Sequence, residues 1–328
     1  MSDHVVASVR TSPPPSRQIN VILRRVDEAE AGARTKAKRW SETAGAPEPF
    51  AEIARELDEM VGMEQVKETI FEIYALLQIA QYRAEAGLAC SPQVYHMIFR
   101  GNPGTGKTTV ARLIAKLFRT MGVLSKGHFI EAERADLVGE YIGHTAIKTR
   151  ELIKRSLGGV LFIDEAYSLT RGGEKDFGKE AIDTLVKAQE DYKDQFVLIL
   201  AGYPDEMDEF MAMNPGLPSR FPIQIDFPDY TLDQLLMIAE KMLKEREYVF
   251  LPQTFMRFKH YLQEERAKFL RGFSNARFVR NTIERCIRQQ AVRLLKQHPS
   301  GSITKQELMQ ICPEDLKIDP SGRHQIYL

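Results

Sequence analysis

The most informative stretch of this sequence is Gly101-Asn-Pro-Gly-Thr-Gly-Lys-Thr-Thr109. It fits the pattern G-x-x-x-x-G-K-[ST] at every fixed position. The glycines allow the backbone to curl so that successive N–H groups point at phosphate oxygens, and a helix that follows adds its positive N-terminal end. Lys107 would reach the outer phosphates, and the Thr108 hydroxyl would be a magnesium ligand. The stretch therefore predicts a site for a nucleoside triphosphate with Mg²⁺.

The residues on either side of this loop have the patterns of a strand and a helix. Upstream, residues 94–99 (VYHMIF) form a short apolar run that is typical of a buried strand. Downstream, apolar side chains recur at helical spacing, at Val110, Leu113, Ile114 and Leu117. Strand, loop and helix thus occur in the order that phosphate binding needs. This context argues against the alternative, a glycine-rich turn that fits the pattern by chance.

A second signal is Gly159-Val-Leu-Phe-Ile-Asp-Glu165. Its four apolar residues predict a strand that is buried on both faces, with two carboxylates at its C-terminal end, where parallel sheets bind ligands. We expect Asp164 to hold the magnesium that Thr108 also contacts, and Glu165 to orient and deprotonate an attacking water. Surface acids that only end a strand are the alternative. The phosphate loop upstream makes that alternative less favoured.

The alternation of strands and helices predicts the fold class. Further apolar runs at residues 127–132, 195–202 and 221–227 bring the expected strands to five. We therefore predict a P-loop α/β protein, a three-layer sandwich around a five-stranded parallel sheet. From Asp229 onward the spacing becomes helical, and Thr231-Leu-Asp-Gln234 is a capping box at the start of this small helical region.

These patterns divide the chain into four parts. We expect an N-terminal extension at 1–48, a nucleotide-binding α/β domain at 49–229, a helical lid domain at 230–320 and a tail at 321–328. Within the extension, residues 12–16 (SPPPS) are typical of a linker, and residues 18–25 are compatible with an isolated strand or a docking segment. A partly disordered tail and a partner-docking arm both remain open for the extension.

Composition excludes several classes of protein. Lysine plus arginine equals aspartate plus glutamate, 45 each, so no net charge draws the chain to nucleic acid or anionic lipid. The cysteines, Cys90, Cys286 and Cys312, lack metal-ligand spacing and suit a reducing compartment. No apolar run approaches the roughly 20 residues of a membrane span, and no secretion signal is recognisable. We therefore expect a cytoplasmic protein without a membrane span or a nucleic-acid partner.

Taken together, these residues resemble the AAA+ ATPases. The resemblance rests on the loop GNPGTGKTT, the strand VLFIDEA, the turn Asn214-Pro-Gly-Leu-Pro-Ser-Arg220 and a helical lid with Asn275-Ala-Arg277. Longer runs at residues 137–146, 158–183 and 198–208 resemble the branch of stage V sporulation K proteins and red-type Rubisco activases. The likeness covers roughly residues 50–320.

The resemblance implies a homo-oligomeric ring, commonly a hexamer, with ATP and Mg²⁺ at each subunit interface. It implies three catalytic residues, Lys107, Glu165 and Arg220, of which Arg220 would come from the neighbouring subunit as an arginine finger. A surface arginine near a turn is the alternative for Arg220. The residues expected to contact the nucleotide are Val61, Gly62, Gly101, Asn102, Pro103, Gly104, Thr105, Gly106, Lys107, Thr108, Thr109, Tyr203 and Arg277.

Two of these assignments depart from common patterns. If Ser274 caps its helix, Arg277 is the third helical residue, where the helix dipole disfavours a cation unless it reaches a triphosphate. Arg280, one turn further on, is a weaker candidate for the same role. Many AAA+ proteins have Asn, Thr or Ser after the fourth strand to sense the γ-phosphate, whereas Tyr203 stands here. Its hydroxyl is a candidate for that sensor.

The triplet Tyr141-Ile142-Gly143 resembles the aromatic pore loop of the family. An exposed aromatic side chain beside a glycine can grip an extended polypeptide while the loop moves. A core tyrosine is the competing interpretation, because the preceding residues 137 and 138 are also apolar. A second loop, residues 171–178 with Phe177, is equally compatible with a pore contact and with a solvated loop.

The function implied by the resemblance is that of an Mg-ATP-dependent ring ATPase that pulls or remodels a protein substrate through a central pore, in spore formation. Activation of Rubisco is one alternative, with the same motor and another target. A nucleic-acid motor or loader is disfavoured by the balanced charge. A non-hydrolysing, nucleotide-gated scaffold is disfavoured because Asp164 and Glu165 are both present.

Overall fold

The chain divides into two compact units, Met1–Ala44 and Gly45–Leu328. The computed structural model describes residues 5–11, 19–25, 48–89, 93–141, 143–171, 177–214, 216–268, 272–299 and 301–317. In the first unit, strand β1 (Val5–Thr11) pairs antiparallel with β2 (Ile19–Arg25). The strand expected at 18–25 is therefore present, but it is not isolated, because a strand that the sequence analysis missed pairs with it along its whole length. The linker at 12–16 lies outside the described residues.

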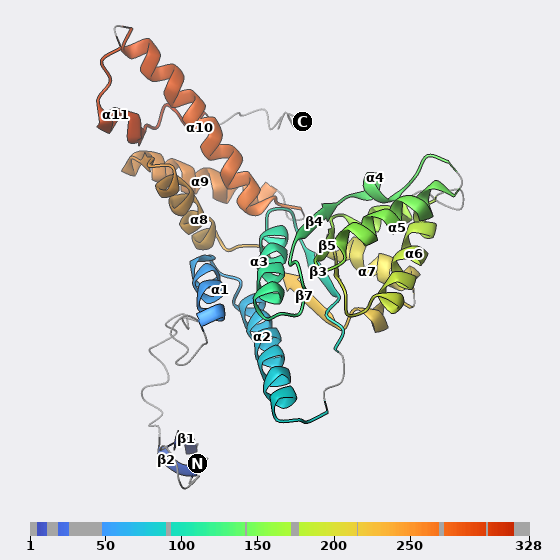
Figure 1. Ribbon diagram of the computed structural model, residues 1–328. Helices are drawn as coiled ribbons and strands as arrows, with labels where there is room; N and C mark the ends of the chain where they lie inside the picture. Colours follow the sequence, from blue (N-terminus) through green and yellow to red (C-terminus); the bar gives the residue numbers. More distant parts are fainter. Residues whose placement is uncertain are drawn as a thin grey trace. The chain divides into compact units, whose positions relative to one another are not determined.

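A five-stranded, all-parallel sheet forms the centre of the second unit (Figure 1). Its strand order is β4-β5-β6-β3-β7, so β3 lies between β6 and β7. The carboxyl ends of β3, β5 and β6 are consequently close together at one edge of the sheet, and the expected parallel sheet is confirmed. The strand bounds are β3 Met97–Gly101, β4 Phe129–Ala132, β5 Val160–Ile163, β6 Val197–Gly202 and β7 Ile223–Phe227.

Helices cover both faces of this sheet, which makes the three-layer sandwich. Figure 1 shows α2 and α3 on one face and α5, α6 and α7 on the other. Every residue of β5 and β6 is buried, as a strand covered on both faces requires. The helix bounds are α1 Glu48–Glu59, α2 Glu64–Glu85, α3 Lys107–Thr120, α4 Arg134–Leu137, α5 His144–Ser156, α6 Gly178–Asp191 and α7 Pro204–Met213, with 3₁₀ turns η3 Ala166–Thr170 and η5 Pro218–Arg220.

Alternate side chains of the strands enter two separate packing layers. Ile98 and Leu161 belong to a buried cluster with residues of α5, α6 and α7, such as Leu185. The side chains at the next positions, Phe99 and Phe162, point to the other face and meet edge to face at 6.5 Å between ring centroids. Because side chains alternate along a strand, the same strands pack in both layers. This packing on two faces fixes the positions of the strand ends.

The helical region follows β7 and has its own core. The predicted capping box is confirmed: Gln234 N donates to Thr231 Oγ1 at 3.2 Å, and Thr231 N donates to Gln234 Oε1 at 2.8 Å. Apolar side chains from three helices, including Leu235, Phe258 and Ile283, form the core. The elements are α8 Leu232–Glu245, β8 Val249–Phe250, α9 Pro252–Lys268, α10 Asn275–Gln297, α11 Lys305–Met309 and β9 Gln310–Ile311.

Within the described ranges, no helix combines the length and the apolar character that crossing a bilayer requires.

Candidate active site

The phosphate loop joins the end of β3 to the start of α3. β3 ends at Gly101 and α3 begins at Lys107, so five residues form the turn between them. Gly104 and Gly106 have φ values of 69° and 96°, which glycine adopts without the steric cost that a Cβ would add. Gly106 is the N-cap of α3, a helix of 14 residues. The loop therefore places a helix N-terminus, with its free N–H groups, beside the loop's own amides.

A cavity of about 450 Å³ lies against this loop, between the sheet and the lid. Its size is in the range of small-ligand sites. Both acids at the end of β5, Asp164 and Glu165, line it. So do nine of the residues predicted to contact the nucleotide, Val61, Pro103, Gly104, Gly106, Lys107, Thr108, Thr109, Tyr203 and Arg277.

The other four predicted contacts, Gly62, Gly101, Asn102 and Thr105, do not line this cavity. Thr105 is buried and donates from Oγ1 to the carbonyl of Asn102 at 2.8 Å. Gly101 is the last residue of β3, and its carbonyl accepts from Lys107. Gly62, between α1 and α2, packs against the side chain of Gln234.

Lys107 is held in a buried position at the centre of the site. Its Nζ donates to the carbonyls of Gly101 at 2.7 Å and Asn102 at 2.9 Å. Burial lowers the pKa of Lys107 and is the largest influence; the negative charge of Asp164 raises this pKa, and the positive charge of Arg277 lowers it. Two cations and two carboxylates thus meet in one partly desolvated space, which favours a polyanionic ligand with a bound cation.

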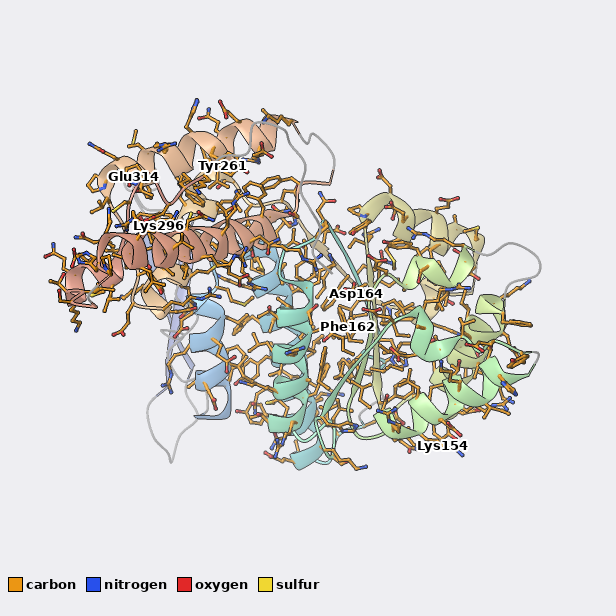
Figure 2. All side chains as sticks on the ribbon, turned by 90° about the horizontal axis from the view of Figure 1, so that it is seen from above. Lys154, Phe162, Asp164, Tyr261, Lys296 and Glu314 are labelled. Atoms are coloured by element: carbon orange, nitrogen blue, oxygen red, sulfur yellow. The ribbon has the colours of Figure 1, made fainter. Side chains whose placement is uncertain are left out.

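Asp164 and Glu165 differ in their local geometry. Asp164 directly follows the last residue of β5, two positions beyond the buried Phe162, and Figure 2 labels both residues. The Asp164 carboxylate accepts a hydrogen bond from the N–H of Glu165 at 3.0 Å. Glu165 has φ 47° and ψ 45°, a left-handed conformation that is unusual for glutamate. Such strain persists only where the surroundings impose it, and it is common at catalytic positions.

Tyr203 follows β6 directly and lines the same cavity. Its ring lies 5.7 Å from that of Tyr167. Burial raises the pKa of Tyr203, and the charge of Glu165 raises it further, whereas Arg277 lowers it. The phenol therefore keeps its proton at neutral pH and can donate a hydrogen bond into the cavity.

The comparison with known proteins supports the nucleotide-binding site that this geometry suggests. Residues 97–229 match the family described as "ATPase family associated with various cellular activities (AAA)", and residues 231–325 match the AAA lid domain. Over 306 residues the chain is 57% identical to Stage V sporulation protein K of Bacillus subtilis (strain 168), which covers 92% of this chain and 94% of that protein. The chain belongs to the AAA+ ATPases. This AAA+ protein is accordingly an ATPase with a nucleotide-binding site.

Two further similarities agree with this family. Over 267 residues the AAA+ chain is 46% identical to the chloroplastic ribulose bisphosphate carboxylase/oxygenase activase of Cyanidioschyzon merolae (strain NIES-3377 / 10D), with 81% of this chain and 90% of that protein covered. A crystal structure of the FIGL-1 AAA domain in complex with ADP matches with a TM-score of 0.54 at 17% identity, over 80% of this chain and 85% of that one. At that identity the structure supports the fold alone.

The two arginines that were predicted to contact phosphate, Arg277 and Arg220, lie in different places relative to the cavity of the AAA+ chain. Arg277 is the third residue of α10 and lines the cavity, and Arg280 lines it as well. Arg220, in η5, is not among the lining residues. Its guanidinium is ion-paired with the carboxylate of Glu190 on α6 and donates to the carbonyl of Gly216 at 2.7 Å.

The predicted pore-loop aromatic is exposed. Tyr141 has 65% of its surface accessible, and its ring packs against the His144 ring at 5.4 Å. The competing interpretation as a core tyrosine is therefore wrong. Gly143 is the N-cap of α5, with φ 81°, whereas Ile142 lies outside the described residues. Phe177, the N-cap of α6, is half-buried, and most of the second predicted pore loop, residues 172–176, is also outside them.

The cavity has an apolar end that was not predicted from the sequence. Met63, Ile238 and Met242 line it together with the predicted Val61. Flat aromatic groups pack well against such side chains, so this end suits the adenine base, while Lys107 marks the phosphate end. Met63 was within reach of a prediction, because it directly follows the predicted contacts Val61 and Gly62. Ile238 and Met242 lie on α8, and no local motif distinguishes them from other apolar residues of the lid.

Glu165→Gln tests whether Glu165 activates water. The variant keeps the shape of the side chain and removes the base, so we expect near-normal affinity for ATP and hydrolysis slowed at least about 100-fold. Phosphate release and titration with a fluorescent ATP analogue measure the two quantities. Glu206→Gln is the matched control, because Glu206 acts electrostatically on Tyr203 but does not line the cavity. Turnover of Glu165→Gln close to that of the unmodified protein would contradict the role.

Proposed function

We propose that this AAA+ ATPase assembles into a ring, a hexamer as is common in the family. The ring uses Mg-ATP to pull or remodel a protein substrate through a central pore, in spore formation. The similarity to Stage V sporulation protein K supports the setting. The observation that carries the proposal is the split arrangement of the cations. Lys107 and Arg277 line the cavity of one chain, while Arg220 is held outside it by Glu190.

The donor set at the cavity fits magnesium. Thr108 offers a hydroxyl from the second residue of α3, and Asp164 offers a carboxylate from the end of β5. Hard oxygen ligands of this kind suit Mg²⁺, which keeps most of its other positions for phosphate and water. Among the described residues, no three His, Cys, Asp or Glu side chains are grouped so that they could hold a metal ion by themselves. Bound there, Mg²⁺ would neutralise charge on the β- and γ-phosphates.

In the proposed mechanism the residues have separate tasks. The phosphate-loop amides and Lys107 hold the triphosphate, and Glu165 orients the attacking water. Arg277 acts in the same chain, and Arg220 is supplied by the neighbour. Within this proposal residues 49–229 are the nucleotide-binding domain, 230–320 the lid, 1–48 an extension and 321–328 a tail. The cysteine content supports a cytoplasmic location.

Arg220 has the freedom that a trans role needs. The side chains of Arg220 and Glu190 are 32% and 61% exposed. An exposed ion pair contributes at most about 1 kcal/mol, so phosphate can replace the Glu190 carboxylate. In a closed ring each subunit offers one surface to one neighbour and a different surface to the other, so a finger on one side can serve a pocket on the other.

A Rubisco-activase-like remodelling factor is the second candidate function. It is favoured by the similarity to the Cyanidioschyzon merolae activase, which extends over most of the chain. The motor would be the same in both cases, and the protein substrate would differ.

Mixing two inactive variants tests the trans role of Arg220. Arg220→Ala and Lys107→Ala should each nearly abolish hydrolysis. In randomly mixed rings, about one quarter of the interfaces pair an intact pocket with an intact finger, so activity should return. ATPase assays on the mixture, with assembly verified by light scattering, measure this. The control mixture combines Lys107→Ala with the Lys107→Ala/Arg220→Ala double variant and should stay inactive. Verified mixed rings without restored activity would exclude the trans finger.

Tyr141→Ala tests the grip on substrate. Because Tyr141 is exposed and lies outside the nucleotide cavity, basal hydrolysis should stay within about twofold of normal. Stimulation of hydrolysis by an unfolded polypeptide, reduced and alkylated lactalbumin, should be lost. Tyr82→Ala on α2 is the control, because Tyr82 is a comparably exposed tyrosine at 52%. Equal stimulation of the Tyr141→Ala variant and the unmodified protein would rule out the grip.

A further inference from the structure

Asn275 connects three segments through one side chain. It is the first residue of α10 and is completely buried. Its Nδ2 donates to Asp229 Oδ1 at 2.7 Å, to the carbonyl of Phe273 at 2.9 Å and to the carbonyl of Pro103 at 3.3 Å. Its Oδ1 accepts from the N–H of Tyr230 at 3.1 Å. A buried amide with every polar group engaged holds its surroundings in one arrangement.

Asp229 extends this network to the phosphate loop. Its two carboxylate oxygens both accept from Nδ2 of Asn102, at 3.0 Å each. Asn102 belongs to the loop and Asn275 to the lid, so one carboxylate receives a donor from each side. Hydrogen bonds to a charged acceptor are about twice as strong as neutral ones. We call these three residues the Asn275–Asp229–Asn102 clamp.

The backbones of the two segments also touch at the clamp. The N–H of Ala276 donates to the carbonyl of Gly104 at 3.2 Å. A Cβ built at Gly104 would lie 2.4 Å from the carbonyl oxygen of Ser274 and 2.7 Å from the nitrogen of Arg277, so no larger residue fits. The phosphate loop therefore lies directly against the first turn of α10, the turn that carries Arg277.

Position 275 also has an unusual backbone conformation. Its φ is 44°, in the left-handed region, which asparagine tolerates better than most residues. Ser274 provides no side-chain cap for the helix, and Arg277 is a cation near the positive helix end and near Lys107. Both features oppose the observed placement of the first turn of α10. The clamp supplies the contacts that offset them.

We propose that Asn275 is the positioning residue of this site: through the Asn275–Asp229–Asn102 clamp it fixes the first turn of α10 on the phosphate loop and thereby aims Arg277 at the phosphates. This inference rests on the proposed role of Arg277 in the same chain. Glycine at position 275 would keep the backbone conformation and lose the clamp. Alanine would lose the clamp and also strain the backbone.

Asn275→Gly is the first test. The amide is lost while the left-handed backbone is retained, so kcat for ATP should fall about tenfold or more, because small displacements of a charged group cost that much. Asn281→Gly is the control for placing glycine in α10; Asn281 is exposed, and this variant should keep its kcat. In an Arg277→Ala background, Asn275→Gly should cause no further loss of kcat, since the clamp acts through Arg277.

The second test exchanges the amide and the carboxylate between positions 275 and 229. Asn275→Asp places a carboxylate against that of Asp229, so kcat should fall further than in Asn275→Gly. Adding Asp229→Asn removes the repulsion and should recover part of the loss. Rescue of kcat would show that the contact between positions 275 and 229 sets the rate, and the Arg277→Ala background then separates the aiming of Arg277 from stabilisation of the lid.

These outcomes decide whether Asn275 positions Arg277 or only stabilises the lid. Losses of kcat from Asn275→Gly and Arg277→Ala that multiply, or an Asn275→Asp/Asp229→Asn variant no better than Asn275→Asp, would overturn the inference. If Arg277→Ala alone leaves kcat unchanged, the proposed role of Arg277 fails, and with it this inference, while hydrolysis at the site stands. Should Asn275→Gly not fold, Asn102→Ala replaces it; this change removes one arm of the clamp, and its loss of kcat must likewise vanish in the Arg277→Ala background.

Discussion

The contact between the phosphate loop and the first turn of α10 is the constraint on which the rest of the site depends. On one side the loop continues from β3, which is held between two neighbouring strands of the sheet. On the other side it contacts the lid so closely that only glycine fits at position 104. At the end of β3, Arg100 pairs with Asp226 at 2.8 Å and with Asp208 at 2.9 Å, which ties the strand to β7 and α7. The nucleotide cavity thus has walls from both domains.

The charge distribution of the cavity would favour a triphosphate with a bound cation. Lys107 is nearly buried and close to Arg277, and both burial and this neighbour disfavour its charged form. Asp164 and Glu165 partly offset this from the end of β5. A polyanion placed over the loop would stabilise both cations, and a divalent cation would satisfy the acids. The apolar end formed by Val61, Met63 and the α8 residues gives the base a separate place.

The sequence predicted those parts of the site whose signals are local. The phosphate loop, the strand before Asp164 and the capping box at Thr231 each need only a few consecutive residues, and the strand order brings the first two together because the sheet is parallel. The Asn275–Asp229–Asn102 clamp could not be predicted, because its hydrogen bonds join residues 46 and 127 positions apart. The exposure of Tyr141 was also open in the sequence, since its apolar neighbour Leu137 is indeed buried.

Under the proposed function, one chain binds the nucleotide, and full catalysis needs Arg220 from a second chain. The most direct measurement is the rate of ATP hydrolysis per protomer as a function of protein concentration, with the mass of the assembly followed by light scattering. We predict a rate near zero for monomers that rises in step with assembly, because Arg220 of each chain would complete the site of its neighbour. A constant rate per protomer down to concentrations at which only monomers are present would contradict this account.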